Sequence, residues 1–283
     1  MKKAFIFSVL FCVFFSLQLV LQQLFLRNSI TPLHLTFLTN LFAFILITAY
    51  LLFFNSKFFK IKFTKKSFWI FTAATLTWMI ADISSMFGLK YSSSINMSLI
   101  SRLQVIITYV LAVIFFKETL TKNKTVAAIL AFVGGLFVVY DFKSAVAINP
   151  GDLLFLLFSI SITVSSLFRQ KIYKHLPAIQ LTYFMYGVSA LFFGAVTIIF
   201  FPLKTMPVPG FILSNSIIAL LGFICVNTAI GLGGATFFSV VSSILPLFTA
   251  ILAFFILGNA PLMTQVVGAV IITYSIYLFT KKP

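Results

Sequence analysis

Two charged residues lie inside apolar stretches of this sequence, where ionised side chains are rare. Asp82 lies in the stretch that begins at Trp69, and Arg102 lies in the following one, which ends near Leu120. Each is about eight residues from the short polar turn between them, so on two antiparallel helices rising roughly 1.5 Å per residue they reach the same depth. A carboxylate and a guanidinium at one depth can bind a charged solute or neutralise each other.

Both interpretations of Asp82 and Arg102 are consistent with the sequence. A charge at the centre of a lipid-facing helix costs about 2.5–3.5 kcal/mol on insertion scales, so both side chains should face the interior. In the first interpretation Arg102 binds an anionic group of a solute, while Asp82 positions that solute or carries a coupling proton. In the second they form an ion pair that only joins two helices.

Further polar and aromatic residues are candidates for the same site. Gln18 is expected at the depth of Asp82, and Gln22 lies one turn further on the same face; their amides can bind a polar solute or join helices. Trp78 shares a helix face with Asp82 and can form an aromatic platform or pack in the core. In the second half, the residues expected to line the pathway are Tyr183, Tyr186 and Asn227.

Other ionisable groups do not form a catalytic pattern. Arg169, Lys171 and Lys174 end an apolar stretch and are expected to extend to the membrane surface. The sequence has no G-x-x-x-x-G-K-[ST] loop and no H-E-x-x-H motif, and its four acidic residues form no cluster. It therefore predicts neither an enzyme nor a bound cofactor or metal.

Composition determines the protein class. Hydrophobic residues make up 61% of the chain and charged residues 8%, far from the roughly 45–50% and 25% of soluble domains. The net charge of +16 is spread over short loops rather than gathered on one face, which argues against a nucleic-acid partner. The chain is predicted to be an integral membrane protein in contact with the lipid bilayer.

Ten apolar segments are long enough to be membrane spans, each of about 20 residues. The expected spans are 4–26, 33–54, 68–90, 95–116, 122–140, 152–172, 178–201, 212–230, 236–257 and 262–280. With the N-terminus in the cytoplasm, most lysines fall on that side, and the exceptions are Arg27, Lys90, Lys143 and Lys204. A cell-membrane location with both termini cytoplasmic follows from this asymmetry.

An internal repeat appears when the chain is shifted by 141 residues. The shift aligns Ser101 with Ser242 and Thr108 with Thr249, together with the hydropathy profile. Five spans per half make the halves, 1–143 and 144–283, inverted relative to each other, an arrangement that transporters use. Phe223 takes the place of Asp82 in the second half, so polar recognition is expected mainly in the first.

The stretch GLKYSSSINMSLISRLQVIITYVLAVIFFKETLTKNKTVAAILAFVGGLFVVY resembles helices three to five of the drug/metabolite transporter superfamily, EamA type. The second half repeats the pattern as ILPLFTAILAFFILGN, with Pro246 at the usual proline position of helix nine. Two positions depart from the family pattern: Gln104-Val105 replaces a proline in helix four, and Asn259 replaces a glutamate.

The resemblance implies an all-helical secondary transporter that works by alternating access, with helices three, four, eight and nine moving around a central cavity. A cavity with one base and one acid suits a small polar or amphipathic metabolite, amino acid-like or neutral to weakly anionic, and export is the expected direction. A coupling proton or an exchanged solute is the expected partner, and a monomer is expected. The alternatives are an exporter of drugs or organic cations, an exchanger of nucleotide sugars or organophosphates, and a membrane scaffold or receptor.

Overall fold

The computed structural model describes residues 1–28, 30–54, 64–116, 121–139, 150–173, 175–200, 209–257 and 263–280. Every regular element in these ranges is a helix, which confirms the all-α fold class. The first half contains α1 (Lys2–Asn28), α2 (Pro32–Phe54), α3 (Lys65–Tyr91), α4 (Ser94–Ile100), α5 (Leu103–Phe116) and α6 (Lys122–Val139). The second contains α7 (Pro150–Ile172), α8 (Ala178–Phe200), α9 (Pro209–Gly233), α10 (Ala235–Val241), η2 (Ser242–Ile244), α11 (Leu245–Leu257) and α12 (Met263–Thr280).

One membrane segment in each half is broken. The expected continuous span 95–116 is divided into α4 and α5, and the expected span 236–257 is divided into α10, η2 and α11. Counting each broken helix once gives five segments per half. Within the described part of the chain, eight helical stretches are long and apolar enough to cross a membrane, and α6 and α12, of 18 residues each, complete the set of ten.

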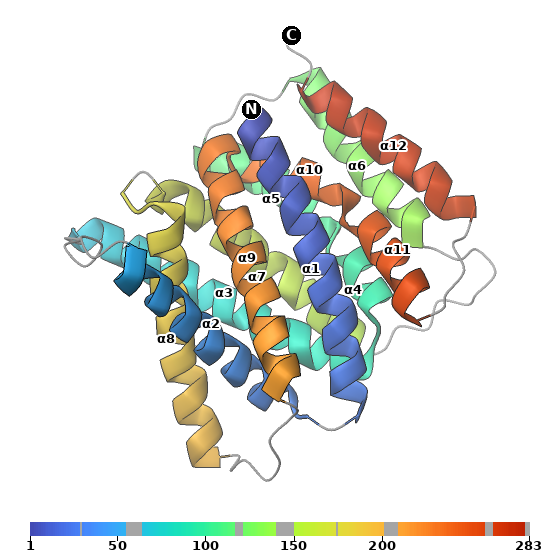
Figure 1. Cartoon of the computed structure of the whole chain (residues 1–283). Coiled ribbons are helices and arrows are strands. Elements are labelled where there is room, and N and C mark those ends of the chain that lie inside the picture. Colours follow the sequence, from blue (N-terminus) through green and yellow to red (C-terminus); the bar gives the residue numbers. More distant parts are fainter. Residues whose placement is uncertain are drawn as a thin grey trace.

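Corresponding helices of the two halves run antiparallel. At one edge of the bundle α2 lies beside α8, where a Cβ added to Gly187 would lie 2.8 Å from the Phe44 ring, and one added to Gly194 would lie 2.8 Å from the Phe37 ring (Figure 1). Later residues of α2 therefore meet earlier residues of α8. Since α2 and α8 are the second segments of their halves, the halves are inverted.

The pair α6 and α12 at the opposite edge shows the same relation (Figure 1). Lys124, at the start of α6, has its Nζ 6.0 Å from the ring centroid of Phe279, at the end of α12. Further along, a Cβ on Gly134 would lie 2.9 Å from the Ile272 side chain. These two fifth segments are also antiparallel, which is expected of an inverted repeat.

A glutamine side chain binds the start of each broken helix. Gln23 Oε1 on α1 accepts a hydrogen bond from the Ser94 backbone N–H at 2.9 Å and another from the Ser94 hydroxyl. Gln170 Oε1 on α7 accepts from the Ala235 N–H at 2.8 Å. Ser94 and Ala235 differ by the 141 residues of the sequence repeat, so the repeat also extends to this capping interaction.

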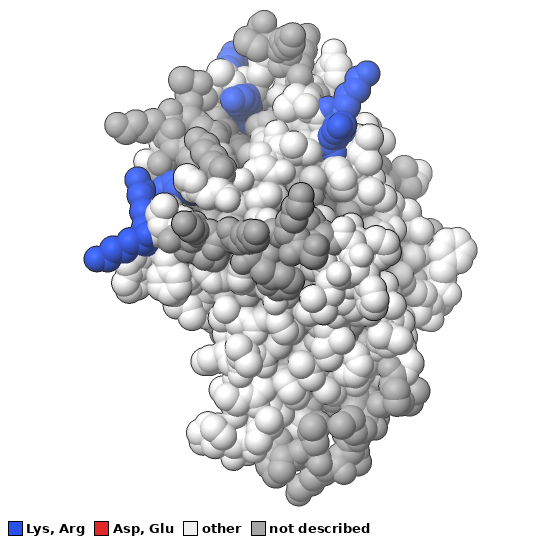
Figure 2. Space-filling model, turned by 60° about the vertical axis from the view of Figure 1, so that its left-hand side comes forward, with Lys and Arg blue, Asp and Glu red and all other residues white. Residues whose placement is uncertain are grey.

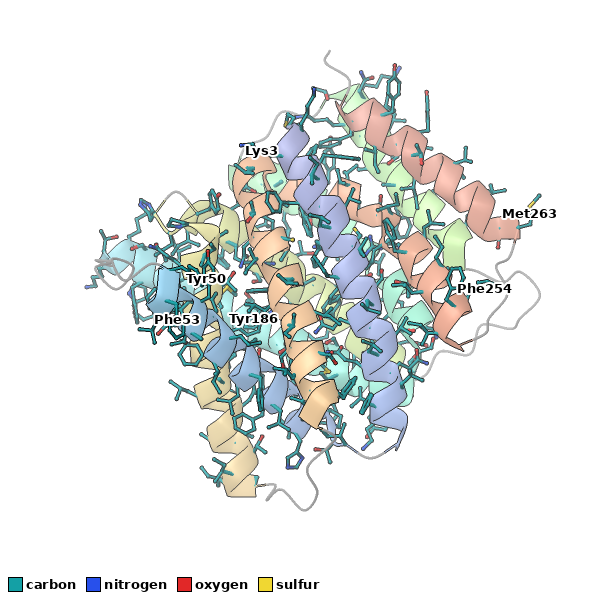
Figure 3. The ribbon with its side chains drawn as sticks, viewed as in Figure 1. Lys3, Tyr50, Phe53, Tyr186, Phe254 and Met263 are labelled. Atoms are coloured by element: carbon teal, nitrogen blue, oxygen red, sulfur yellow. The ribbon has the colours of Figure 1, made fainter. Side chains whose placement is uncertain are left out.

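The outer surface of the bundle is apolar. Phe53 is 83% exposed, Leu191 77% and Phe255 76%, and Phe53 and Met263 project outward in Figure 3 while Tyr186 lies inside. Exposed apolar side chains on this scale are not tolerated by monomeric proteins in water and instead mark contact with lipid. The protein is therefore a multi-pass membrane protein.

The two ends of the chain approach the same end of the bundle. Phe279, near the end of α12, packs against the buried cluster that contains Ala4, near the start of α1. On the face drawn in Figure 2, lysine and arginine side chains lie in the upper half, toward this end. The expected boundary between the halves, at 143/144, falls in 140–149, outside the described residues, as do Glu118, Lys174 and Asn259.

Candidate functional site

A central cavity lies between the two halves. Its walls come from the long helices α1, α2, α3, α7, α8 and α9 and from both broken segments. Five of the eight predicted site residues line it, namely Gln18, Trp78, Asp82, Arg102 and Tyr186. The structure thus brings together side chains from helices that are distant in the sequence.

Asp82 faces the cavity from the middle of α3 and is bound by an asparagine of α2. Asn40 Nδ2 donates to Asp82 Oδ2 at 2.9 Å and also to the Thr36 carbonyl at 2.9 Å. Asn40 is buried and itself lines the cavity. The sequence interpretation did not include Asn40, although an asparagine inside the apolar stretch Pro32–Phe54 was a signal that could have identified it.

Arg102 is buried at the break between α4 and α5 and binds carbonyl and hydroxyl groups. Its Nε donates to the Ser98 carbonyl at 3.1 Å, its Nη2 donates to Ser101 Oγ at 2.9 Å, and its Nη1 donates to the Ser242 carbonyl. Arg102 and Asp82, both among the described residues, form no salt bridge with each other. The interpretation of these two residues as a direct ion pair is therefore wrong for this conformation.

Pro246 explains why the Ser242 carbonyl lacks its regular helical donor. In a continuous helix that oxygen accepts the backbone N–H four residues later, and proline has none. The Leu245 N–H turns back to it in a 3₁₀ geometry, and Arg102 and Cys12 of the first half also donate to it, the Cys12 Sγ at 3.8 Å. Arg102 thus joins the two broken segments across the interface between the halves.

A second guanidinium, that of Arg169 on α7, also lines the central cavity. The expectation that Arg169 extends to the membrane surface is wrong, because its side chain is 1% exposed. Its Nη1 donates to Asn227 Oδ1 at 3.0 Å and its Nη2 to Ser166 Oγ at 2.9 Å. A sequence signal was available, since Arg169 follows Ser166 and Thr163 on one polar stripe of the helix.

Three aromatic side chains form a cluster in the wall of the cavity. The ring centroids of Trp78 and Phe223 are 4.5 Å apart, those of Trp78 and Tyr186 5.3 Å, and those of Tyr186 and Phe223 5.2 Å. Trp78 is one helical turn from Asp82 on α3, and the Arg169 Cζ lies 5.3 Å from the Phe223 centroid. The aromatic cluster therefore lies between an acid of the first half and a base of the second.

The remaining predicted site residues lie outside the cavity wall. Gln22 is buried, and its Nε2 is without a hydrogen-bond partner among the described residues. Tyr183 packs against Phe44, with ring centroids 5.1 Å apart, in a satellite cluster. Asn227 supports the cavity indirectly, because its amide binds Arg169 on one side and Thr182 Oγ1 on the other at 2.9 Å.

The expectation that polar recognition is concentrated in the first half is also wrong. Phe223 does replace Asp82 at the corresponding position, but Arg169 and its asparagine partner supply a charge from the second half at a position unrelated by the 141-residue shift. The cavity consequently has charged groups on both sides of the pseudo-symmetric interface.

Comparison with known families agrees with this architecture. A family model described as "EamA-like transporter family" matches residues 2–140 and again residues 149–281, once in each half. The chain belongs to the EamA-like transporter family. Family membership points to a transporter rather than an enzyme and implies a small-molecule solute and a lipid environment.

Individual relatives of this EamA protein add detail on the fold. The chain is 29% identical over 204 residues to "Uncharacterized transporter YyaM" of Bacillus subtilis (strain 168), a match that covers 65% of this chain and 64% of that protein's length. It is also similar to a solved structure described as "Crystal structure of protein", with a TM-score of 0.78 and 14% identity over 99% of this chain and 97% of the other. The second likeness shows the fold alone.

Proposed function

We propose that this EamA-family protein is a secondary transporter that exports a small polar or amphipathic metabolite, amino acid-like or neutral to weakly anionic. One observation carries the proposal, namely a central cavity between two inverted halves, lined by Asp82 of the first half and Arg169 of the second. Inverted repeats around a midplane site are the arrangement that supports alternating access. The cavity lies within one chain, which favours a monomer.

Solute contacts in this proposal come from the residues of the cavity wall. Asp82 receives an ammonium or hydroxyl group, Gln18 hydrogen-bonds a polar group, and Trp78 and Tyr186 contact the apolar body. Arg102 positions the two broken helices around the solute through its bond to the Ser242 carbonyl. Three further residues pack outside the cavity lining and make no direct contact with the solute in this proposal, namely Gln22, Tyr183 and Asn227.

Movement in the proposed cycle takes place at the broken segments and at α3 and α9. The breaks lack the regular i→i−4 hydrogen bonds of a helix: Gln104 N–H bonds to the Ser101 carbonyl and Val105 N–H to the Arg102 carbonyl, each three residues back. Fewer regular bonds make a segment easier to bend. The gathering of basic side chains at one end supports cytoplasmic termini in the cell membrane.

The organic-cation alternative is less well supported by the cavity. Two guanidiniums, of Arg102 and Arg169, line it together with the single carboxylate of Asp82. Like charges in a space of low dielectric repel strongly, so a cationic solute is disfavoured. A coupling proton on Asp82 remains part of the proposal, since Asp82 is the one acidic residue among the described residues that line the cavity.

Uptake into proteoliposomes tests the transport proposal. Purified protein is reconstituted, and a panel of labelled amino acids, neutral metabolites and organic cations is offered with and without a pH gradient. Accumulation of at least one polar metabolite is expected, with a loss in Asp82→Asn and no loss in Lys65→Gln, which removes a charge at the first residue of α3. If folded protein moves no member of the panel under either condition, the proposal is wrong.

A further inference from the structure

Arg169 is a buried charge whose bonded partners are neutral. Its two hydrogen-bond acceptors are the amide oxygen of Asn227 and the hydroxyl of Ser166, and its Nε is buried without a partner among the described residues. Asp152, on the same helix, is 17 residues away, or about 25 Å along α7. An isolated guanidinium inside a membrane bundle is costly and is a functional-site candidate by default.

We propose that Arg169 binds a carboxylate group of the solute, and that Arg102 does not. The proposal rests on the transport function proposed above and specifies one of its solute contacts. Arg169 lines the cavity and has three donors left after its two hydrogen bonds, namely the second N–H of Nη1, the second N–H of Nη2 and the buried Nε. A guanidinium presents five N–H donors in a planar fork that matches the two oxygens of a carboxylate.

The surroundings of Arg169 hold this fork ready for an anion. Thr182 Oγ1 accepts from Asn227 Nδ2, which turns the amide oxygen of Asn227 toward the guanidinium. The guanidinium lies over the ring of Phe223, and the Arg169 Cζ is 5.3 Å from the centroid of that ring. An arginine fixed at its Nη atoms and stacked on a ring loses little further side-chain entropy when it binds, which favours affinity.

Arg102 is a poorer candidate for the same role. Its Nε, Nη1 and Nη2 all donate already, two of them to the backbone carbonyls of Ser98 and Ser242 at the helix breaks. Only the second N–H of Nη1 and the second N–H of Nη2 remain free, so a solute anion there would share a guanidinium that already binds two backbone carbonyls and a hydroxyl. Its contacts are those of a residue that fixes the two broken segments.

The geometry also limits the class of solute. With one free guanidinium in reach, a singly charged carboxylate fits better than a phosphate dianion, which calls for several donors and charges. The aromatic cluster of Trp78, Tyr186 and Phe223 beside Arg169 suits an apolar or aromatic body on that carboxylate. The expected solute is a monocarboxylate with an apolar body, with or without an ammonium group for Asp82.

A binding experiment can test this independently of transport. The chain has two tryptophans, so Trp69→Phe leaves Trp78, in the cavity wall, as the single tryptophan, whose fluorescence is followed. This protein in nanodiscs is titrated with 3-phenylpropionate, its neutral analogue 3-phenylpropanamide, phenethylamine and phenyl phosphate. We expect the carboxylate to bind more tightly than the amide and the phosphate ester.

Arg169→Gln is expected to weaken 3-phenylpropionate binding about tenfold or more, and to change 3-phenylpropanamide binding less than about twofold. Arg169→Lys should recover part of the difference, and Lys171→Gln, which removes a charge from the end of the same helix, should have no effect. Arg102→Gln should weaken both probes to a similar extent, because it distorts the cavity. If Arg102→Gln does not fold, the comparison of acid and amide binding in Arg169→Gln and Arg169→Lys still tests the inference.

Several results would overturn the inference. They are an equal loss for acid and amide in Arg169→Gln, a carboxylate-specific loss in Arg102→Gln, a preference for phenyl phosphate, and no binding of 3-phenylpropionate to the unmodified site. Carboxylate-selective binding without any uptake would remove the transport proposal and leave this inference in place. If solutes without a carboxylate are taken up, and Arg169→Gln takes them up equally well, the inference about Arg169 is wrong and the transport proposal stands.

Discussion

The two broken helices of this EamA protein reach similar shapes by different chemistry. In the second half, Pro246 removes the backbone N–H that would bond to the Ser242 carbonyl in a continuous helix, and the Leu245 N–H bonds to that carbonyl instead. In the first half, Val105 occupies the corresponding position, and the Arg102 side chain bonds to the carbonyl of Ser98 at the break. The same arginine is an additional, charged donor to the Ser242 carbonyl at the second break. The two halves therefore share an architecture, but the side chain that bonds to the carbonyls at both breaks comes from the first half alone.

The charges that face the cavity show a related difference between the halves. Asp82 in the first half accepts a hydrogen bond from the Asn40 amide nitrogen, whereas Arg169 in the second donates to the Asn227 amide oxygen. One residue type satisfies opposite charges because its amide is both donor and acceptor. Repetition of the fold thus gives two sites of opposite charge instead of two copies of one site.

Exchanging the two charges of the first half gives the largest expected effect on transport. In Asp82→Arg with Arg102→Asp, the new carboxylate would face the carbonyl oxygens of Ser98 and Ser242, and the new guanidinium would face the Asn40 amide nitrogen. We expect each single variant and the exchange to show no uptake above empty liposomes. Recovery of full uptake in the exchange would mean that the two residues pair with each other, and the contrast between the halves would fail.

Arg102→Leu is expected to lower stability by about 2 kcal/mol, because three charged hydrogen bonds are lost and the cost of burying the charge is only partly recovered. The measurement is the apparent melting temperature in detergent, followed by size-exclusion chromatography. In a Pro246→Ala background, residue 246 regains an N–H for the Ser242 carbonyl, so the same change should cost about 1 kcal/mol less. Strict additivity of the two substitutions would contradict the proline explanation.

Val105→Pro would place a proline at the first break, as in the second. We expect a loss of about 1–2 kcal/mol, since the Val105 N–H bond to the Arg102 carbonyl, 3.0 Å long, would be removed at a site where no distant side chain replaces it. Val105→Ala is the control for the lost side chain, and both are compared by the same melting assay. A proline variant as stable as the alanine variant would show that the two breaks are interchangeable.

Cys12→Ala is expected to have the smallest effect, below about 1 kcal/mol, because the thiol is a weak donor to the Ser242 carbonyl at 3.8 Å. Cys225→Ala removes the same atom from the other buried cysteine. The difference between the two melting temperatures isolates the contact with the break. If Cys12→Ala destabilises as strongly as Arg102→Leu, the arginine is not the principal donor there.

The sequence predicted the membrane class, the inverted five-segment halves and five of the residues that line the cavity. Composition alone excludes a soluble fold, and the 141-residue shift aligns Ser101 with Ser242, the residues at the two breaks. Asp82 could be recognised because an acidic side chain inside an apolar stretch almost always faces the interior of the bundle. Trp78 followed from Asp82 by helical spacing, since four residues bring side chains onto one face.

Side-chain partners could not be predicted, because they depend on how helices from the two halves pack. Arg102 and Asp82 share a depth, yet the breaks turn Arg102 toward the Ser242 carbonyl, which is 140 residues away in sequence. Arg169 stands beside lysines that suggest a membrane surface, and only the packing of α7 against α9 places it in the cavity. Hydropathy and spacing fix depth and helix face, whereas the choice of partner belongs to the tertiary structure.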